Sequence, residues 1–325
     1  MFQPDAKASV TRQRALAMGG RVAGGLVAAA SLGATAVAQT RNSTVASPFS
    51  TQGTIHQIEQ IIQAQGMVSN GVFSIEIDRD DITNVTLRGV PIKPAFQING
   101  ALNFQAIGGG RAVMNSDMAL KPSELDPFID QLLAHDIVFQ AEHQHFYDFS
   151  PLVWFIHFRA AGDPLQIARG VKAALNVTST PFPQTSPTNP KTPLPAQELG
   201  KIIGGTPSIG ADGVVTINIP REDPIVLGGI RISPFLNIPT GVVFQPYGGG
   251  QNAAAAPDFA MISSEVQNVV GTMRRQGWDI GCLYNQETDE QPQLYFSHQF
   301  KTGNALELAR EIRAGLNRTD SKFMS

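Results

Sequence analysis

Residues 118–178 read MALKPSELDPFIDQLLAHDIVFQAEHQHFYDFSPLVWFIHFRAAGDPLQIARGVKAALNVT. Residues 259–319 repeat this pattern without a gap, at a constant offset of 141 residues. The offset places His157 on His298. A match of this length between two parts of one chain indicates an internal duplication.

The duplication also extends upstream of residue 118. The shared landmarks are Ile77-x-Arg79-x-Asp81 with Ile219-x-Arg221-x-Asp223, Pro94 with Pro234, Phe104-Gln105 with Phe244-Gln245, and glycines 108–110 with 248–250. Features kept in both copies are interpreted as scaffold. Arg79 and Asp81, just after a strand, are therefore interpreted as a turn-stabilising pair, and Ser123-Glu124 as the start of a helix. A feature present in one copy is a better candidate for function.

The first copy mixes two hydrophobic periods. Runs of period two predict strands over 72–77, 82–87, 101–107 and 112–120. Helical spacing predicts helices over 55–64, 122–134 and 163–175, the last capped by Asp163 with Pro164 at its first position. This mixture predicts an α+β fold in two tandem copies of one unit. Each unit is expected to be a mostly antiparallel sheet with helices packed on a face.

The remaining segments set the expected domain organisation. The ranges are 1–38 for a cleavable export signal, 39–53 for a flexible tail, 54–178 for the first repeat, 179–196 for a linker rich in Pro, Ser and Thr, and 197–320 for a second, degenerate repeat. The six prolines of the linker give it no means of forming a core.

The amino terminus predicts export from the cytoplasm. A basic start precedes a soft apolar run over 22–34, and Ala36-Val37-Ala38 matches an A-x-A cleavage site. The run is shorter than the roughly 20 apolar residues of a spanning helix. No cysteine follows the cleavage site, so lipid anchoring is not expected. We expect cleavage after Ala38, by the twin-arginine or the general secretory route, and a periplasmic or secreted product without a membrane span.

Composition excludes several classes of protein. The 325-residue chain is 42% apolar with a net charge of −3, which supports a folded core and argues against nucleic acid as a partner. A single cysteine, Cys282, excludes an internal disulfide and is interpreted as a buried core thiol. The triple glycines lack the strand and helix context of a phosphate loop, so no nucleotide cofactor is expected.

A pair of histidines occurs in the first copy alone. The segment 139–158 is predicted to form two adjacent antiparallel strands that flank a turn-like centre at 147–151. His143 and His145 should project from one face of the first strand. The second copy has Tyr284 and Gln286 at these positions. Neutral imidazoles bind borderline divalent metals. The sequence therefore predicts a metal site, with zinc as the first choice, or a site for a small polar ligand, in a partly exposed pocket.

Two histidines make a weak site, so a third ligand is needed. His157 shares a face with His143 only if the residue numbers paired between their strands sum to an even value. Otherwise it is a core histidine bonded to backbone. Asp148, in the intervening turn, is the alternative ligand. The candidate metal ligands are thus His143, His145 and His157.

The order of these motifs resembles that of the LppY/LpqO-type family of exported bacterial proteins. The resemblance rests on an Ala-x-His-x-His strand, an aromatic strand ending in His, and the helix start Gly162-Asp163-Pro164, all within a duplicated chain. It covers roughly residues 54 to 320. The family is largely uncharacterised, so the resemblance implies fold and export and adds little on activity.

Three functions fit these observations. The first is an exported binding protein that holds a divalent metal or a small polar ligand at the histidine pair. The second is a metal-dependent hydrolase that uses the same histidines and a carboxylate base. The third is a structural or partner-binding envelope protein. A carboxylate within reach of the metal position would favour the hydrolase.

Overall fold

The structure is a computed structural model that describes residues 52–185 and 190–324. The predicted export signal (1–38) lies outside the described residues, as does the predicted tail up to residue 51. The described chain forms two tandem α+β units, as predicted from the duplication.

The first unit is built on a six-stranded antiparallel sheet. Its strands, in spatial order, are β1 (Met67–Ser69), β2 (Val72–Asp78), β5 (Asn99–Gly108), β6 (Arg111–Leu120), β9 (Trp154–Gly162) and β7 (Val138–His143). A three-stranded sheet lies beside it, in the order β4 (Val90–Pro91), β3 (Thr86–Leu87), β8 (Phe149–Ser150).

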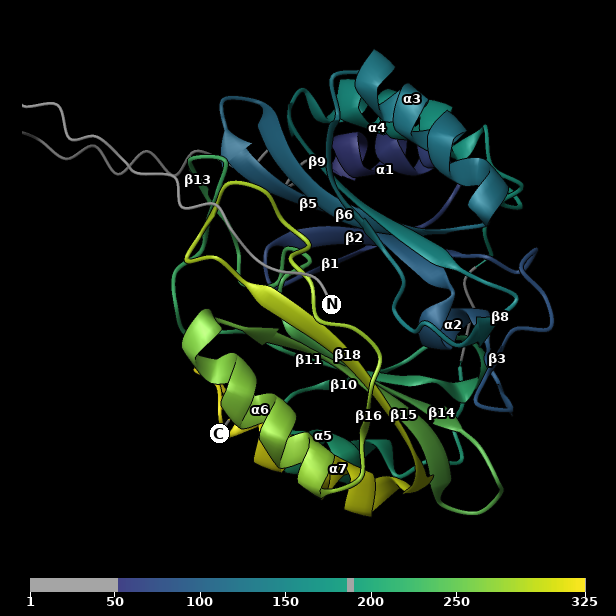
Figure 1. Ribbon diagram of the computed structural model, residues 1–325. Coiled ribbons are helices and arrows are strands. Elements are labelled where there is room, and N and C mark those ends of the chain that lie inside the picture. The colour runs from purple at the N-terminus through teal and green to yellow at the C-terminus, as the bar shows by residue number, and fades with distance from the viewer. Residues whose placement is uncertain (1–51, 186–189, 325) are drawn as a thin grey trace, which may run out of the picture. The chain divides into compact units, whose positions relative to one another are not determined.

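Three helices cover one face of this sheet (Figure 1). They are α1 (Gln52–Ile62), α3 (Leu125–Ala134) and α4 (Pro164–Leu175), while the short helix α2 (Pro94–Gln97) precedes β5 and the 3₁₀ turn η2 (Pro122–Glu124) precedes α3. Asp163 caps α4 as predicted, because its Oδ1 accepts from the Leu165 and Gln166 amides. Alternate residues of β6, such as Met114 and Met118, pack against these helices.

The second unit repeats this order. Its large sheet runs β10 (Pro207–Ile209), β11 (Val215–Ile219), β14 (Thr240–Pro246), β15 (Asn252–Met261), β18 (Tyr295–Asn304) and β16 (Asp279–Ile280). The strands of its small sheet, in spatial order, are β13 (Ile230–Arg231), β12 (Val226–Leu227) and β17 (Glu290–Gln291). Its helices are α5 (Ala196–Ile203), α6 (Ser263–Arg275) and α7 (Ala305–Leu316), and η3 (Ala211–Gly213) is a 3₁₀ turn.

The other faces of the two large sheets meet each other. One buried cluster contains residues of both repeats, and Phe146 of the first lies with its ring 6.0 Å from that of Phe300 of the second. Alternation along β6 and β9 sends Asn115, Asp117 and His157 to this shared face. The interface between the repeats therefore contains polar side chains as well as an apolar cluster.

Equivalent residues make the same contacts in both directions across this interface. Gln245 Oε1 accepts from the Lys93 amide at 2.9 Å, and its equivalent Gln105 accepts from the Ser233 amide at 2.6 Å. Each glutamine also donates from Nε2 to a backbone carbonyl of the same loop in the other repeat. Reciprocal contacts of this kind are those of a pseudo-two-fold axis.

The predicted turn pair is part of a larger buried ion-pair group. Arg79 is fully buried and donates to Asp81 at 2.9 Å, to Glu124 at 2.8 Å and to the Ala119 carbonyl. Glu124 also accepts from the Lys121 amide at the start of the helix, as expected for helix-start chemistry. Arg221 makes the equivalent contacts with Asp223 and Glu265.

The prediction that the linker 179–196 takes no part in a core is wrong, because Leu194 and Ala196 are buried in the core of the second unit and Phe182 packs against the core of the first. Two predicted secondary-structure elements also differ from the structure. Within the predicted strand 82–87, only Thr86–Leu87 pairs with neighbouring strands. Ile82 instead donates its amide to the Arg79 carbonyl in a turn, because the buried arginine fixes the backbone there. The predicted helix 122–134 begins with the 3₁₀ turn at Pro122–Glu124 before it becomes α-helical.

Candidate metal centre

The register between β7 and β9 decides where His157 points. Ala141 pairs with His157, and His143 pairs with Phe155, so the numbers sum to 298 and His157 shares a face with His143. Nearer the start of β7 the pairing is Phe139 with Phe158, which sums to an odd value. The β-bulge between residues 139 and 141 makes this change. The bulge thus brings His157 to the site.

His145 reaches the site from outside the strand. The prediction that both histidines project from one strand is wrong for His145, because β7 ends at His143. His145 and Phe146 are consecutive and both buried, which the alternation of a half-buried strand does not permit. The ring of His145 stacks instead on the ring of Phe155, with the two ring centroids 3.3 Å apart.

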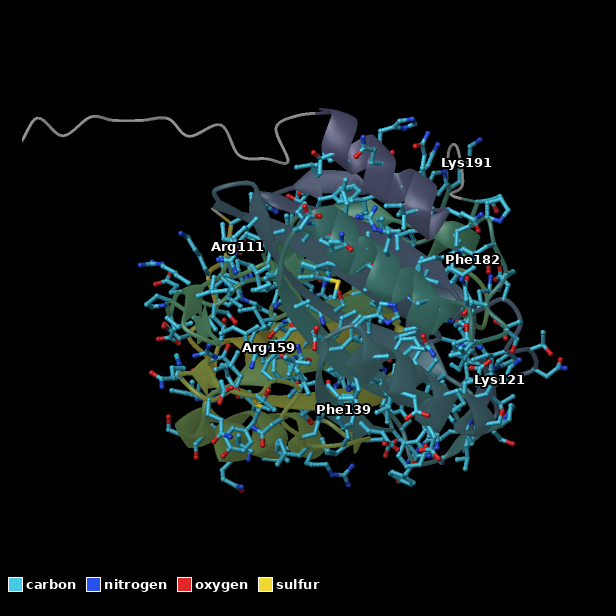
Figure 2. The ribbon with its side chains drawn as sticks, turned by 90° about the horizontal axis from the view of Figure 1, so that it is seen from above. Arg111, Lys121, Phe139, Arg159, Phe182 and Lys191 are labelled. Carbon is cyan, nitrogen blue, oxygen red and sulfur yellow. The ribbon has the colours of Figure 1, made fainter. Side chains whose placement is uncertain are left out.

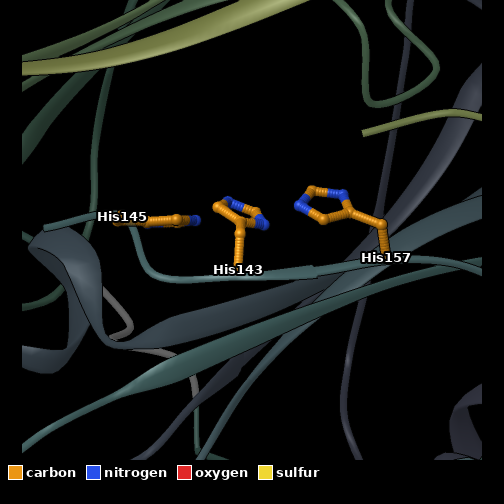
Figure 3. A group of neighbouring side chains, drawn as sticks. All are labelled: His143, His145 and His157. Atoms are coloured by element: carbon orange, nitrogen blue, oxygen red, sulfur yellow. The ribbon is translucent and has the colours of Figure 1, made fainter. Parts of the chain in front are cut away.

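The three rings form one cluster (Figure 3). His143 is central, with its ring centroid 5.1 Å from that of His145 and 5.0 Å from that of His157. One nitrogen from each ring can be chosen so that all three lie within 4.8 Å of one another. His145 and His157 are 8% and 3% exposed, and His143 is half-buried. The predicted partial exposure therefore applies to His143 alone.

The ring nitrogens of this cluster lack the hydrogen bonds that burial normally demands. All four nitrogens of His143 and His157 are buried without a partner in the described part of the chain. Buried polar groups are nearly always paired, so an unpaired set is a sign of a bound group. Burial lowers the pKa of His157 to about 3 and lowers the pKa of His143 well below its usual value. Both rings are therefore neutral at pH 7, the form that binds a metal ion.

His145 is oriented by a buried glutamine. Gln97, the last residue of helix α2, is 8% exposed, and its Oε1 lies 3.0 Å from Nδ1 of His145. An amide oxygen can only accept, so Nδ1 carries the proton and donates it. Nε2 of His145 is left with a lone pair. Metal-binding histidines are commonly fixed in this way by a hydrogen bond at the other nitrogen.

The alternative ligand Asp148 is engaged elsewhere. Its Oδ2 forms an ion pair with Nε of Arg88 at 2.9 Å. It does not belong to the group of close metal-ligating side chains, which consists of His143, His145 and His157 within the described residues.

Comparison with known families identifies the repeated unit. A model described as Domain of Unknown Function (DUF1259) matches residues 56–177 and again residues 197–318. The chain belongs to the DUF1259 family. No curated protein sequence matches the chain. A solved structure titled as a trimeric bacterial microcompartment shell protein, PduB, shares 9% identity over 79% of this chain and 91% of its own, with a TM-score of 0.20. That likeness is too weak to inform the fold.

The second DUF1259 repeat also contributes side chains to the cluster. Tyr284 occupies the position equivalent to His143, and the two rings stack on each other at 3.6 Å. His298, equivalent to His157, stacks on His145 at 3.7 Å. These contacts were missed in the sequence, because a comparison of the two copies does not reveal that their equivalent residues touch.

Cys282 lies at the edge of this cluster and not in the apolar core. It is half-buried, and its Sγ lies 3.3 Å from Nδ1 of His298. Nε2 of His298 lies 3.6 Å from Oδ2 of Asp258. Burial raises the pKa of the Cys282 thiol, and the charge of Asp258 raises it further. The interpretation of Cys282 as a thiol in the apolar core was therefore wrong, because its Sγ lies beside the His298 ring.

Three carboxyl groups lie near the histidines, of which Glu287 is buried and Asp117 and Asp258 are half-buried. Asp117 pairs with His157 in the β6–β9 register, and Asp258 is its equivalent in the second DUF1259 repeat. Burial raises the pKa of Asp117 to about 7, and burial together with the charge of Asp117 raises the pKa of Asp258 to about 8. Burial also raises the pKa of Glu287 to about 7, although Asn115 donates to this residue at 2.7 Å. The pKa values of these three carboxyl groups are thus raised toward neutral pH.

The lowered pKa of His157 predicts a pH dependence of stability. Between about pH 6.5 and pH 3 the unfolded chain binds a proton at His157 that the folded protein does not, so stability falls as the pH falls. Relative to a His157→Gln variant, the metal-free wild type should lose up to roughly 2–3 kcal/mol between pH 6.5 and pH 4.5. Urea unfolding with chelator present at a series of pH values measures this difference.

The comparison with His157→Gln is needed because the carboxyl groups with raised pKa values make the folded protein more stable as the pH falls. Their effect on stability opposes that of His157 and is present in both proteins. Exposed His135 provides the control, since a His135→Gln variant should follow the wild type across the same pH range. Parallel curves for wild type and His157→Gln would show that His157 is not held neutral by burial.

Proposed function

We propose that this protein binds a divalent metal ion, zinc by preference, at His143, His145 and His157, and acts as an exported binding protein. The observation that carries the proposal is the set of four buried nitrogens on His143 and His157 that have no partner within residues 52–185 and 190–324. A metal ion would occupy one nitrogen on each ring. Imidazole nitrogen is a preferred ligand of zinc.

The spacing of the rings is compatible with zinc after a small movement. Zinc–nitrogen bonds of about 2.1 Å in a tetrahedron hold the nitrogens roughly 3.4 Å apart. The candidate nitrogens lie within 4.8 Å of one another. The widest pair would have to approach by about 1.4 Å at most, which small rotations about the side-chain torsions supply.

The direct test is metal analysis. The mature protein, purified without added metal and then equilibrated with zinc, should retain about one zinc per chain after removal of the unbound ion. Isothermal titration of chelator-treated protein should give the same stoichiometry. Absence of bound zinc in both measurements would refute the proposal.

The contact between Gln97 and His145 gives a sharper prediction. A Gln97→Leu variant should weaken zinc binding about 10- to 100-fold, because His145 loses the acceptor that fixes its tautomer and ring orientation. Gln97→Glu keeps an acceptor and should stay close to wild type. Gln166→Leu, at an exposed position of α4, is the control for the change of residue type. Equal zinc affinity in Gln97→Leu and wild type would mean that His145 is not a ligand.

We also propose that the protein acts outside the cytoplasm. The basis is the leader sequence with Ala36-Val37-Ala38 and the resemblance to LppY/LpqO-type exported proteins. Within the described ranges, no helix is both long and apolar enough to cross a membrane. N-terminal sequencing of the exported protein should begin at Gln39, and mature material that begins at Met1 would contradict cleavage.

A metal-dependent hydrolase is the second candidate, and the carboxyl groups of Asp117 and Asp258 favour it. Asp117 and Asp258 have pKa values of about 7 and 8, which suit groups that exchange protons at neutral pH. A hydrolase would show zinc-dependent turnover of simple carboxylic or phosphoric esters, and Asp258→Asn would abolish it while zinc remains bound. A binding protein would show no turnover with either protein.

A further inference from the structure

A largely buried arginine lies two residues beyond His157 on strand β9. Arg159 pairs with Asn115 across the β6–β9 register, and His157 pairs with Asp117, so both side chains point to the face that meets the second repeat. The Arg159 side chain is 16% exposed. It is labelled in Figure 2, as is Phe139 of the neighbouring strand β7.

The arginine is a feature of the first repeat alone. The equivalent position in the second repeat is Phe300, which is buried in the cluster between the repeats. The fold therefore accepts an apolar ring at this place, and the guanidinium is not needed to complete the sheet. Arg159 in this respect resembles His143 and His145, which are also replaced in the second repeat.

Arg159 has donor capacity that its protein contacts do not use. Its Nη2 donates to Oδ2 of Asp289 at 3.1 Å, and the Asp289 side chain is 78% exposed. Its Nε is buried and has no hydrogen-bond partner among the described residues. The unpaired N–H of this guanidinium can therefore donate a hydrogen bond to an acceptor that is bound in the site.

The second repeat provides room for this guanidinium. A Cβ atom added to Gly228 would lie 2.0 Å from Nη1 of Arg159, and Gly228 has a φ of +55°. Only a glycine lets the backbone approach the arginine so closely. The equivalent residue in the first repeat is Arg88, so the glycine is specific to the side that faces Arg159.

We infer that the metal centre takes a small oxyanion, a carboxylate or phosphate group, and that Arg159 is the residue that recognises its charge. This inference rests on the proposed metal site. Side chains two residues apart on a strand are about 7 Å apart at their Cα atoms, so one oxyanion can contact both a metal held by His157 and the Nε of Arg159. The planar guanidinium matches the geometry of carboxylate and phosphate oxygens.

The positive charges of a bound metal ion and of the guanidinium favour an anion. Histidine binds a metal ion through neutral imidazole, so an ion held by three histidines keeps its positive charge, and the guanidinium adds a second one. The competing occupant is water, which would satisfy the same N–H without any preference for charge.

The test is titration of zinc-loaded protein, freed of unbound zinc, with inorganic phosphate and separately with acetate. Wild type should bind at least one of them, and the stronger binder identifies phosphate or carboxylate as the group. Arg159→Gln should weaken this binding about 10- to 100-fold, because a charged hydrogen bond is lost. Its zinc affinity should change by less than about threefold, since Arg159 is not a ligand.

Two further variants keep the test decisive. Asp289→Asn removes the surface partner but leaves the guanidinium, so anion binding should stay or become tighter. Arg159→Phe copies the second repeat and serves if Arg159→Gln does not fold. Equal anion affinity in wild type and the Arg159 variants, or binding of neither anion by zinc-loaded wild type, would overturn the inference. If the wild-type protein binds no zinc, the metal site is refuted instead. Binding of phosphate to this zinc-free protein that depends on Arg159 would still support recognition of the anion by Arg159.

Discussion

A His143→Ala/His145→Ala double variant is expected to lose zinc binding. Two of the three rings in the cluster are removed, and one remaining histidine supplies too few of the three or four protein ligands that zinc takes. The loss of zinc affinity should therefore exceed the roughly 10- to 100-fold loss expected when a residue that hydrogen-bonds to a metal ligand is removed. Zinc titration by calorimetry, with the metal content of the purified protein, measures it.

Thermal unfolding gives an independent readout of the same site. Zinc at 100 times its Kd should stabilise the wild type by about 2.7 kcal/mol, which corresponds to a rise in Tm of about 5 °C that a chelator reverses. The double variant should show neither the rise nor the reversal. His56→Ala/His135→Ala, at two exposed positions, should behave as wild type. If the double variant and wild type respond equally to zinc and chelator, His143 and His145 are not ligands.

The second large effect is expected at the buried ion pairs. Arg79→Met should destabilise the fold by roughly 3–5 kcal/mol, because the buried Glu124 loses its opposite charge and the Ala119 carbonyl loses the guanidinium as a donor. Urea unfolding at pH 7 measures the loss. Arg221→Met should cost a similar amount, since Arg221 makes the equivalent contacts in the second repeat.

The control for this prediction is a surface arginine. Arg111→Met, at an exposed position at the start of β6, should change stability by less than about 0.5 kcal/mol. Adding Glu124→Gln to Arg79→Met should recover part of the loss, because the second substitution removes the uncompensated buried charge. A cost below about 1 kcal/mol for Arg79→Met would mean that the ion pair contributes little beyond its packing.

The fold could be predicted from the sequence because each unit obeys local rules. Period-two runs became β2, β5 and β6, and helical spacing became α1, α3 and α4. Because the chain contains a duplication, the architecture predicted for one unit also applied to the other. Where tertiary contacts overrode the pattern, as at Ile82 beside the buried Arg79, the strand prediction was wrong.

The candidate site was less predictable, for physical reasons that differ between residues. The face of His157 depends on a single bulge near Gln140, and no local pattern marks that extra residue. His145 is placed by Phe155 and Gln97, which are distant in sequence or on other elements. Arg159 had a usable signal, since its replacement by Phe300 marks it as specific to the first repeat.

The reciprocal contacts of Gln105 and Gln245 mean that the chain is arranged as a tethered homodimer. In a true homodimer every substitution appears twice, so a residue beside the symmetry axis must face its own copy. Joining the halves into one chain removes that constraint. His143 can then lie against Tyr284, and Arg159 can have Phe300 as its counterpart, while the shared framework is preserved. Covalent fusion thus permits an asymmetric site on a symmetric scaffold.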